Sequence, residues 1–125
     1  MMIGVVNNSR EAVIQVVLRN DTASTKLIRA VVDTGYTGDL MLPRSIVDEL
    51  KLRFYGIQEA ILGDGSSKML RVYQGSVIWD GMIRRLEIHA SESEALVGMG
   101  LLENYRLDIE ARPGGTVRIT PLKEE

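Results

Sequence analysis

Asp33-Thr34-Gly35 is the segment of this sequence best suited to chemistry. It follows the mostly apolar run at residues 27–32 and precedes a second glycine, Gly38. A carboxylate delivered by a buried strand into a glycine-rich turn lies in a low-dielectric environment close to backbone N–H groups, and this favours general acid–base chemistry. The alternative is a plain turn, because Asp and Gly are both common turn residues.

Two further segments have features that would serve such a carboxylate. Residues 60–70 have apolar arms around the polar tip Gly63-Asp64-Gly65-Ser66, a pattern typical of a long hairpin. Such a hairpin can close over a bound peptide and exclude water, although an ordinary surface hairpin explains the pattern equally well. Residues 95–102 form an apolar segment with Gly98 inside it, which taken alone is best explained as a core strand. The lack of a side chain at Gly98 would also let the loop carrying Asp33 pass close by.

Other kinds of site find little support in the sequence. There is no cysteine, and His89 is the only histidine, so neither a metal site nor a serine triad has its usual ligands or base. We expect His89 to be a strand residue half exposed to solvent. The glycines near 63 and 98 do not complete a dinucleotide-binding G-x-G-x-x-G pattern, because Lys68 and Glu103 occupy the last position. We therefore expect no metal and no cofactor.

The elements that must position these residues are mostly strands. Residues 11–19 and 26–33 are rich in β-branched residues and are separated by turn residues. Asp80-Gly81 is a strong hairpin signal, and a second turn separates predicted strands at 105–110 and 116–120. Short helices are predicted at 43–50 and 99–105. This spacing predicts an all-β sandwich or partly closed barrel.

Length and composition set the broad class. The 125 residues suffice for one domain, 1–125, with 45% hydrophobic and 26% charged residues, as in a globular protein. A net charge of −2 gives no reason to expect nucleic acid or an anionic membrane as partner. No apolar run approaches the roughly 20 residues that span a bilayer. The lack of cysteine and of a recognisable signal peptide predicts a cytoplasmic protein.

Taken together, these segments resemble the retropepsin-like aspartic proteases, in particular the small bacterial single-domain type. The likeness rests on three matches in the same order and rough spacing: Val31-Val32 before Asp33-Thr34-Gly35, the glycine-rich hairpin, and Leu96-Val97-Gly98 before a short helix. It covers nearly the whole chain. The resemblance implies an all-β, retropepsin-like half-barrel with one or two short helices.

The resemblance also implies a function and a set of site residues. Each subunit of a homodimer would contribute Asp33 to a shared site on the two-fold axis, where the pair activates water against a peptide bond. Thr34 would form a hydrogen bond across the axis, and Gly35 would face the substrate backbone. The hairpin tip, Gly63 to Ser66, would be a flap over a peptide or protein substrate, and Gly98 would pack beside the site. In this family the chain ends often pair at the dimer interface, which here predicts residues 3–6 and 117–119.

The need for two chains also follows from counting carboxylates. None of Asp21, Asp64 and Asp80 both follows two apolar residues and precedes Thr-Gly or Ser-Gly, so the chain holds one suitable carboxylate. A site with two of them needs two chains, and a symmetric dimer is the commonest way to supply them.

One departure from the family pattern affects the expected pH dependence. Pepsin-like relatives commonly carry a serine after the Asp-Thr-Gly, and that serine binds the outer carboxylate oxygen, whereas this sequence has Tyr36. A tyrosine hydroxyl lies too far out on its ring for that role, which leaves Thr37 as the candidate. We therefore expect a bell-shaped pH–rate profile with an optimum less acid than pepsin's.

Two alternatives to the protease remain open at this stage. One is a non-catalytic dimer of the same fold that binds peptides along the cleft and flap. The other is a monomeric β domain in which Asp33 is only a turn residue.

Overall fold

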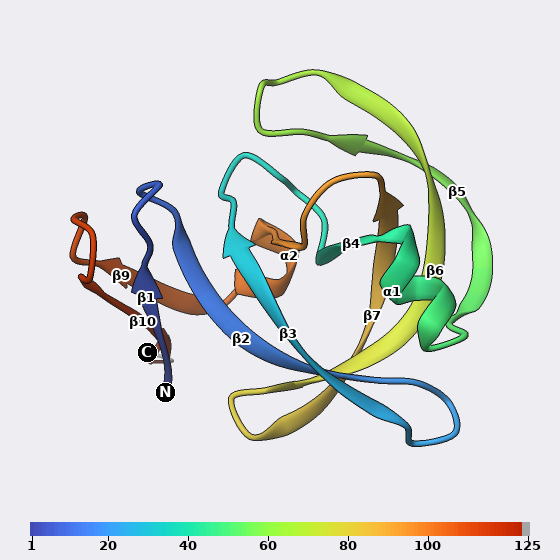
Figure 1. Ribbon diagram of the computed structural model, residues 1–125, viewed down its shortest axis with the longest axis horizontal. Coiled ribbons are helices and arrows are strands. Elements are labelled where there is room, and N and C mark those ends of the chain that lie inside the picture. Colours follow the sequence, from blue (N-terminus) through green and yellow to red (C-terminus); the bar gives the residue numbers. More distant parts are fainter. Residues whose placement is uncertain (124–125) are drawn as a thin grey trace.

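Strands joined into one sheet dominate the computed structural model, which describes residues 1–123 (Figure 1). The elements, in chain order, are β1 (Met2–Val6), β2 (Ala12–Arg19), β3 (Thr25–Val32), β4 (Leu40–Pro43), α1 (Arg44–Glu49), β5 (Arg53–Ile61), β6 (Ser67–Trp79), β7 (Met82–Ser91), β8 (Leu96–Val97), α2 (Met99–Leu102), β9 (Tyr105–Ile109) and β10 (Thr116–Pro121). The strand order is β5-β6-β7-β4-β8-β3-β2-β1-β10-β9. An additional pairing of β6 with β2 closes the strands from β6 to β2 into a barrel. The predicted all-β class is thus confirmed.

Local sequence signals account for most of these elements. Asp80 and Gly81 both have positive φ, 50° and 82°, which is the backbone conformation that a two-residue hairpin between β6 and β7 requires. Pro43 stands at the N-cap of α1, one residue before the first helical position. Helix α2 ends at Leu102, earlier than predicted, because Tyr105 already pairs with Pro121 in the sheet.

The buried side chains form two clusters of unequal size. The larger one fills the barrel and includes Leu18, Leu40, Val77 and Ile88, all fully buried. The smaller one joins the β5–β6 hairpin to the loop after β3, and its members are Tyr36, Met41, Ala60 and Leu70, with Leu62 and Leu96 partly buried against them. The smaller cluster is what fixes the hairpin over the site described below.

The chain ends pair with each other inside the protomer, at the lower left of Figure 1. Strand β10 lies between β1 and β9, so both of its backbone edges are occupied, and Val117 and Ile119 are fully buried. Residues 117–119 therefore have no free backbone edge for pairing with a partner, and the dimer interface expected at residues 3–6 and 117–119 stays a prediction. Strand β9, at the end of the strand order, carries the outer edge instead.

Within residues 1–123, no helix has the length and apolar character needed to cross a membrane. The same part of the chain contains no cluster of three or more His, Cys, Asp or Glu side chains able to hold a metal ion.

Candidate active site

Asp33 lies at the end of β3, where hydrogen bonds to the neighbouring strand hold it in place. Its backbone N–H donates to the carbonyl of Val97 at 2.9 Å, because β3 and β8 run parallel and in register at this point. The carboxylate is half-buried, and its Oδ1 accepts a hydrogen bond from the backbone N–H of Gly35 at 2.9 Å. The Asp33 carbonyl accepts a further bond from the N–H of Tyr36. The turn is therefore closed on itself by these hydrogen bonds, and within residues 1–123 the second carboxylate oxygen, Oδ2, accepts none.

The predicted hairpin connects β5 and β6. Its tip is closed by a bond from the Leu62 N–H to the Ser66 carbonyl at 2.8 Å, and Gly65 supplies a positive φ of 84°. The Asp64 carboxylate accepts hydrogen bonds from the side chain and backbone of Ser66, and these lower the pKa of Asp64. Asp64 and Ser66 thus stabilise the turn itself.

The tip of this hairpin lies over the Asp33 loop, as Figure 1 shows at the top of the molecule. A Cβ atom placed on Gly35 would lie 2.6 Å from the Cα of Gly63, and a Cβ on Gly63 would lie 3.1 Å from Asp33 Oδ2. The backbones at Gly35 and Gly63 are therefore so close that a side chain at residue 35 would collide with residue 63. The structure brings together Asp33, Gly35 and Gly63, as the sequence predicted, whereas Asp64, Gly65 and Ser66 form the far side of the tip.

A cavity of about 310 Å³ opens beside this contact. Its floor is apolar and its rim carries charged and hydroxyl side chains; the lining residues are Tyr36, Met41, Leu62, Gly63, Lys68, Leu70, Ser91, Glu92, Ser93 and Leu96. A mostly apolar pocket with a few polar groups is the usual form of a site that binds a small molecule. The Ser91–Glu92–Ser93 segment of this rim carried no signal in the sequence.

Gly98 packs against the same loop, but at residues 36–38 and not at Asp33 itself. A Cβ atom on Gly98 would lie 2.2 Å from the Gly38 carbonyl oxygen and 2.5 Å from the Tyr36 ring. The Gly98 N–H donates to the carbonyl of Asp39 at 3.0 Å. A side chain at residue 98 would therefore collide with the Gly38 carbonyl and the Tyr36 ring, so this position needs glycine.

Tyr36 and His89 form a buried pair under the loop, and this corrects the expectation of a half-exposed histidine. His89 is only 4% exposed and Tyr36 is fully buried. The Tyr36 hydroxyl is hydrogen-bonded to His89 Nδ1 at 2.5 Å and forms no hydrogen bond with the Asp33 carboxylate within residues 1–123. Burial lowers the pKa of His89 and raises the pKa of Tyr36 far above its ordinary value. In residues 1–123, Thr37 forms no hydrogen bond with Asp33, so the structure does not give it the serine's role.

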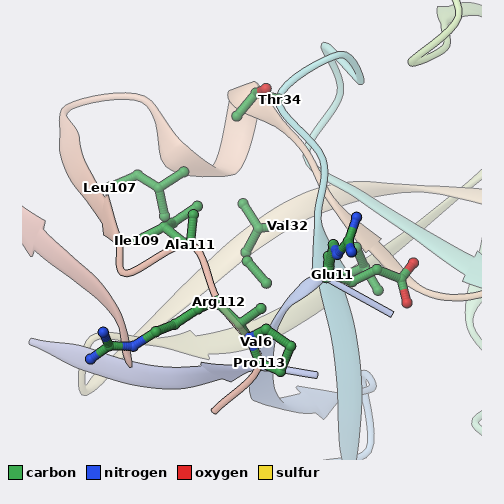
Figure 2. Close-up of a pocket in the computed structure, with 12 residues that line it drawn as sticks. Val6, Glu11, Val32, Thr34, Leu107, Ile109, Ala111, Arg112 and Pro113 are labelled. Carbon is green, nitrogen blue, oxygen red and sulfur yellow. The ribbon is translucent and has the colours of Figure 1, made fainter. Parts of the chain in front are cut away.

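A second cavity, of about 540 Å³, lies on the other side of the Asp33 loop, next to Thr34 (Figure 2). Side chains from β3 and β9 face one another across it, and Thr34 lies at one end. Its lining is mainly apolar and consists of Val6, Arg10, Glu11, Ala12, Val31, Val32, Thr34, Leu107, Ile109, Ala111, Arg112 and Pro113. Thr34 is exposed here. The arrangement leaves its hydroxyl accessible from outside the protomer.

Comparison with known proteins supports the fold defined by these strands. The chain is similar to a retropepsin-like aspartic protease from Rickettsia conorii, known from a crystal structure, with a TM-score of 0.62 and 16% sequence identity. The match covers 98% of this chain and 91% of that one. The sequence matches no protein-family model and no curated protein. The chain thus has the retropepsin-like fold, and the identity is too low to carry function across by itself.

Proposed function

We propose that the protein is a homodimeric aspartic endopeptidase in which Asp33 from each of two subunits activates a water molecule. The observation that carries this proposal is the place of Asp33-Thr34-Gly35 in the retropepsin-like fold, at the end of β3 and directly beneath the glycine-rich hairpin. The Gly35 N–H holds Oδ1 of this half-buried carboxylate, whereas Oδ2 lies against Gly63 and would become available for chemistry when the hairpin tip is lifted.

The chemistry follows from placing two such carboxylates together. Like charges this close do not both ionise readily, so the pair shares one proton. The ionised carboxylate takes a proton from water, and its protonated partner donates a hydrogen bond to the scissile carbonyl. The water oxygen attacks the carbonyl carbon, and collapse of the tetrahedral intermediate with proton transfer to the nitrogen releases the amine. Gly35 and the hairpin tip would align the peptide backbone, and the 310 Å³ cavity would hold one of its side chains.

Two features support a dimer formed next to Asp33. The groove beside Thr34 is mainly apolar and adjoins β9, the last strand of the sheet. An accessible hydroxyl at Thr34, the residue after the carboxylate, is suited to a hydrogen bond with the equivalent loop of a second subunit. A partner seated there would bring its own Asp33 close to the first.

The test combines subunit mass with peptide cleavage. Sedimentation should show a dimer, at least with a statine-type transition-state mimic bound, because such mimics bind much more tightly than substrates. A peptide library should be cleaved with a bell-shaped pH profile. Asp33→Asn should reduce kcat by roughly a thousandfold or more, since the two carboxylates act as a unit. Asp21→Asn is the matched control, because Asp21 also precedes a threonine but lies exposed in a turn.

Two outcomes would contradict the proposal. A chain that stays monomeric with the mimic present cannot assemble the pair of carboxylates. A dimer that binds peptides but cleaves none across the pH range would favour the alternative, a peptide-binding module of the same fold.

A further inference from the structure

The backbone of Tyr36 is hydrogen-bonded both to the Asp33 turn and to the start of helix α2. Its N–H donates to the Asp33 carbonyl at 3.2 Å, and its own carbonyl accepts a bond from the Met99 N–H at 2.8 Å. Its ring lies so close to Gly38 and Gly98 that a Cβ atom at either position would collide with it. The position of this ring therefore determines where the backbone of residues 33–38 can lie.

His89 provides a rigid attachment for that ring. It lies in β7, opposite Val72 of β6 and Met41 of β4, so strands pair with it on both sides. The two rings meet edge to face, with centroids 5.7 Å apart and an interplanar angle of 74°. Within residues 1–123, the Tyr36 hydroxyl is the only hydrogen-bond partner of the His89 ring nitrogens. It binds Nδ1, and Nε2 is buried without a hydrogen-bond partner.

The surroundings keep this hydrogen bond between neutral groups. Asp39, in the loop before β4, and Glu87, in β7, are the charged side chains that act on the pair. Both favour a protonated His89, but burial outweighs them and the pKa of His89 is lowered. The pKa of Tyr36 is raised by burial first and by the same two carboxylates next. At neutral pH a single proton therefore lies between the phenol oxygen and Nδ1.

We propose that Tyr36 and His89 are a positioning pair, which holds the Asp33 loop against β7 so that the carboxylate keeps its working orientation. This inference rests on the proposed protease function. The pair does not touch the reacting atoms; it acts through the backbone bond from Tyr36 to Asp33. Misplacement of a catalytic group by about 1 Å can lower the rate by about a hundredfold.

The experiment separates the hydroxyl–imidazole bond from simple packing. Tyr36→Phe keeps the ring and removes the bond, and His89→Leu removes it from the other side. Each should lower kcat about tenfold with KM within about twofold, and the double variant should be no worse than either single one, because both remove the same interaction. His89→Asn retains an acceptor near the position of Nδ1 and should restore most of kcat. Tyr73→Phe, at another buried tyrosine, is the control and should behave as the wild type.

A second readout does not depend on cleavage. Amide hydrogen exchange at residues 35–38 should be faster in Tyr36→Phe than in the wild type or in Tyr73→Phe, because the loop loses its attachment. Unchanged kcat together with unchanged exchange in Tyr36→Phe would overturn the positioning role. A wild type that cleaves nothing would overturn the proposed function instead, and the exchange rates would then decide the role of the pair alone.

Discussion

Gly63, at the tip of the β5–β6 hairpin, lies against the Asp33 carboxylate of the same chain. The contact leaves 3.1 Å between a Cβ on Gly63 and Asp33 Oδ2, and the neighbouring Leu62 packs into the cluster around Tyr36 and Met41. In this arrangement the hairpin occupies the space above the carboxylate that a substrate backbone would need. If the proposed function holds, binding of a peptide would therefore lift the tip, and Leu62 would leave its contacts.

The first prediction concerns this contact. Gly35→Ala should displace the hairpin, because the new Cβ would lie 2.6 Å from the Cα of Gly63, and a backbone atom cannot yield without moving the whole tip. Amide exchange at residues 62–66 should become faster. Gly56→Ala is the control, since a Cβ there meets nothing within 4 Å in the same hairpin. Equal exchange in the two variants would show that the tip is not held by this contact.

The second prediction concerns Thr34. Thr34→Ala should weaken the proposed dimer while leaving the subunit nearly as stable as before, because the side chain is exposed and faces the groove in Figure 2. Two symmetric hydrogen bonds of about 1 kcal/mol each correspond to a roughly 30-fold rise in the dimer Kd. Sedimentation gives the Kd, and urea unfolding gives the stability of the subunit. A Kd that stays within twofold would place the interface elsewhere.

The parts of the site that follow from local pattern could be predicted from the sequence. The apolar run into Asp33, the glycine-rich tip at Gly63 and the hairpin at Asp80 are each encoded within a few residues, and the structure places all three as expected. The turn residues fix backbone geometry locally, so no tertiary information was needed.

The environment of His89 could not be predicted, because it depends on contacts distant in sequence. Its neighbours Ile88 and Ala90 face the barrel core, so alternation along the strand indicates that His89 faces outward. That outer face is covered by the loop after β3, whose Tyr36 lies 53 positions away in the chain. The burial of Val117 and Ile119 also depends on distant contacts, because β10 pairs with β1 from the other end of the chain and with β9. The local sequence pattern therefore could not predict it.

The third prediction concerns the pH dependence of stability near Glu94. Slight desolvation of this exposed carboxyl and, next, the neighbouring Glu11 carboxylate raise the pKa of Glu94. A raised pKa in the folded state means that the associated stability is present at acid pH and is lost as the pH rises through that pKa. Glu94→Gln should therefore increase the melting temperature at pH 7–8, and the gain should shrink towards pH 4.

Thermal unfolding at a series of pH values measures this effect. Glu103→Gln is the control, because Glu103 is exposed at the end of α2 and lies in another part of the chain. The effect should be small, since Glu94 is largely solvated and water screens its interaction with Glu11. A gain that grows towards acid pH would contradict the prediction.

The last prediction concerns His89, whose contribution to stability should fall at acid pH, whereas that of Glu94 falls as the pH rises. Burial lowers the pKa of His89 below its ordinary value of 6.5, so the stability that this residue contributes is present above pH 6.5 and is lost as the pH falls towards the lowered pKa. Urea unfolding should show the wild type losing stability below pH 6.5, by at most about 1.4 kcal/mol per pH unit for one proton. His89→Asn cannot take up that proton, so its curve should be flatter over the same range. Tyr73→Phe keeps the histidine and should run parallel to the wild type. Parallel curves for the wild type and His89→Asn would mean that the buried ring does not charge before the chain unfolds.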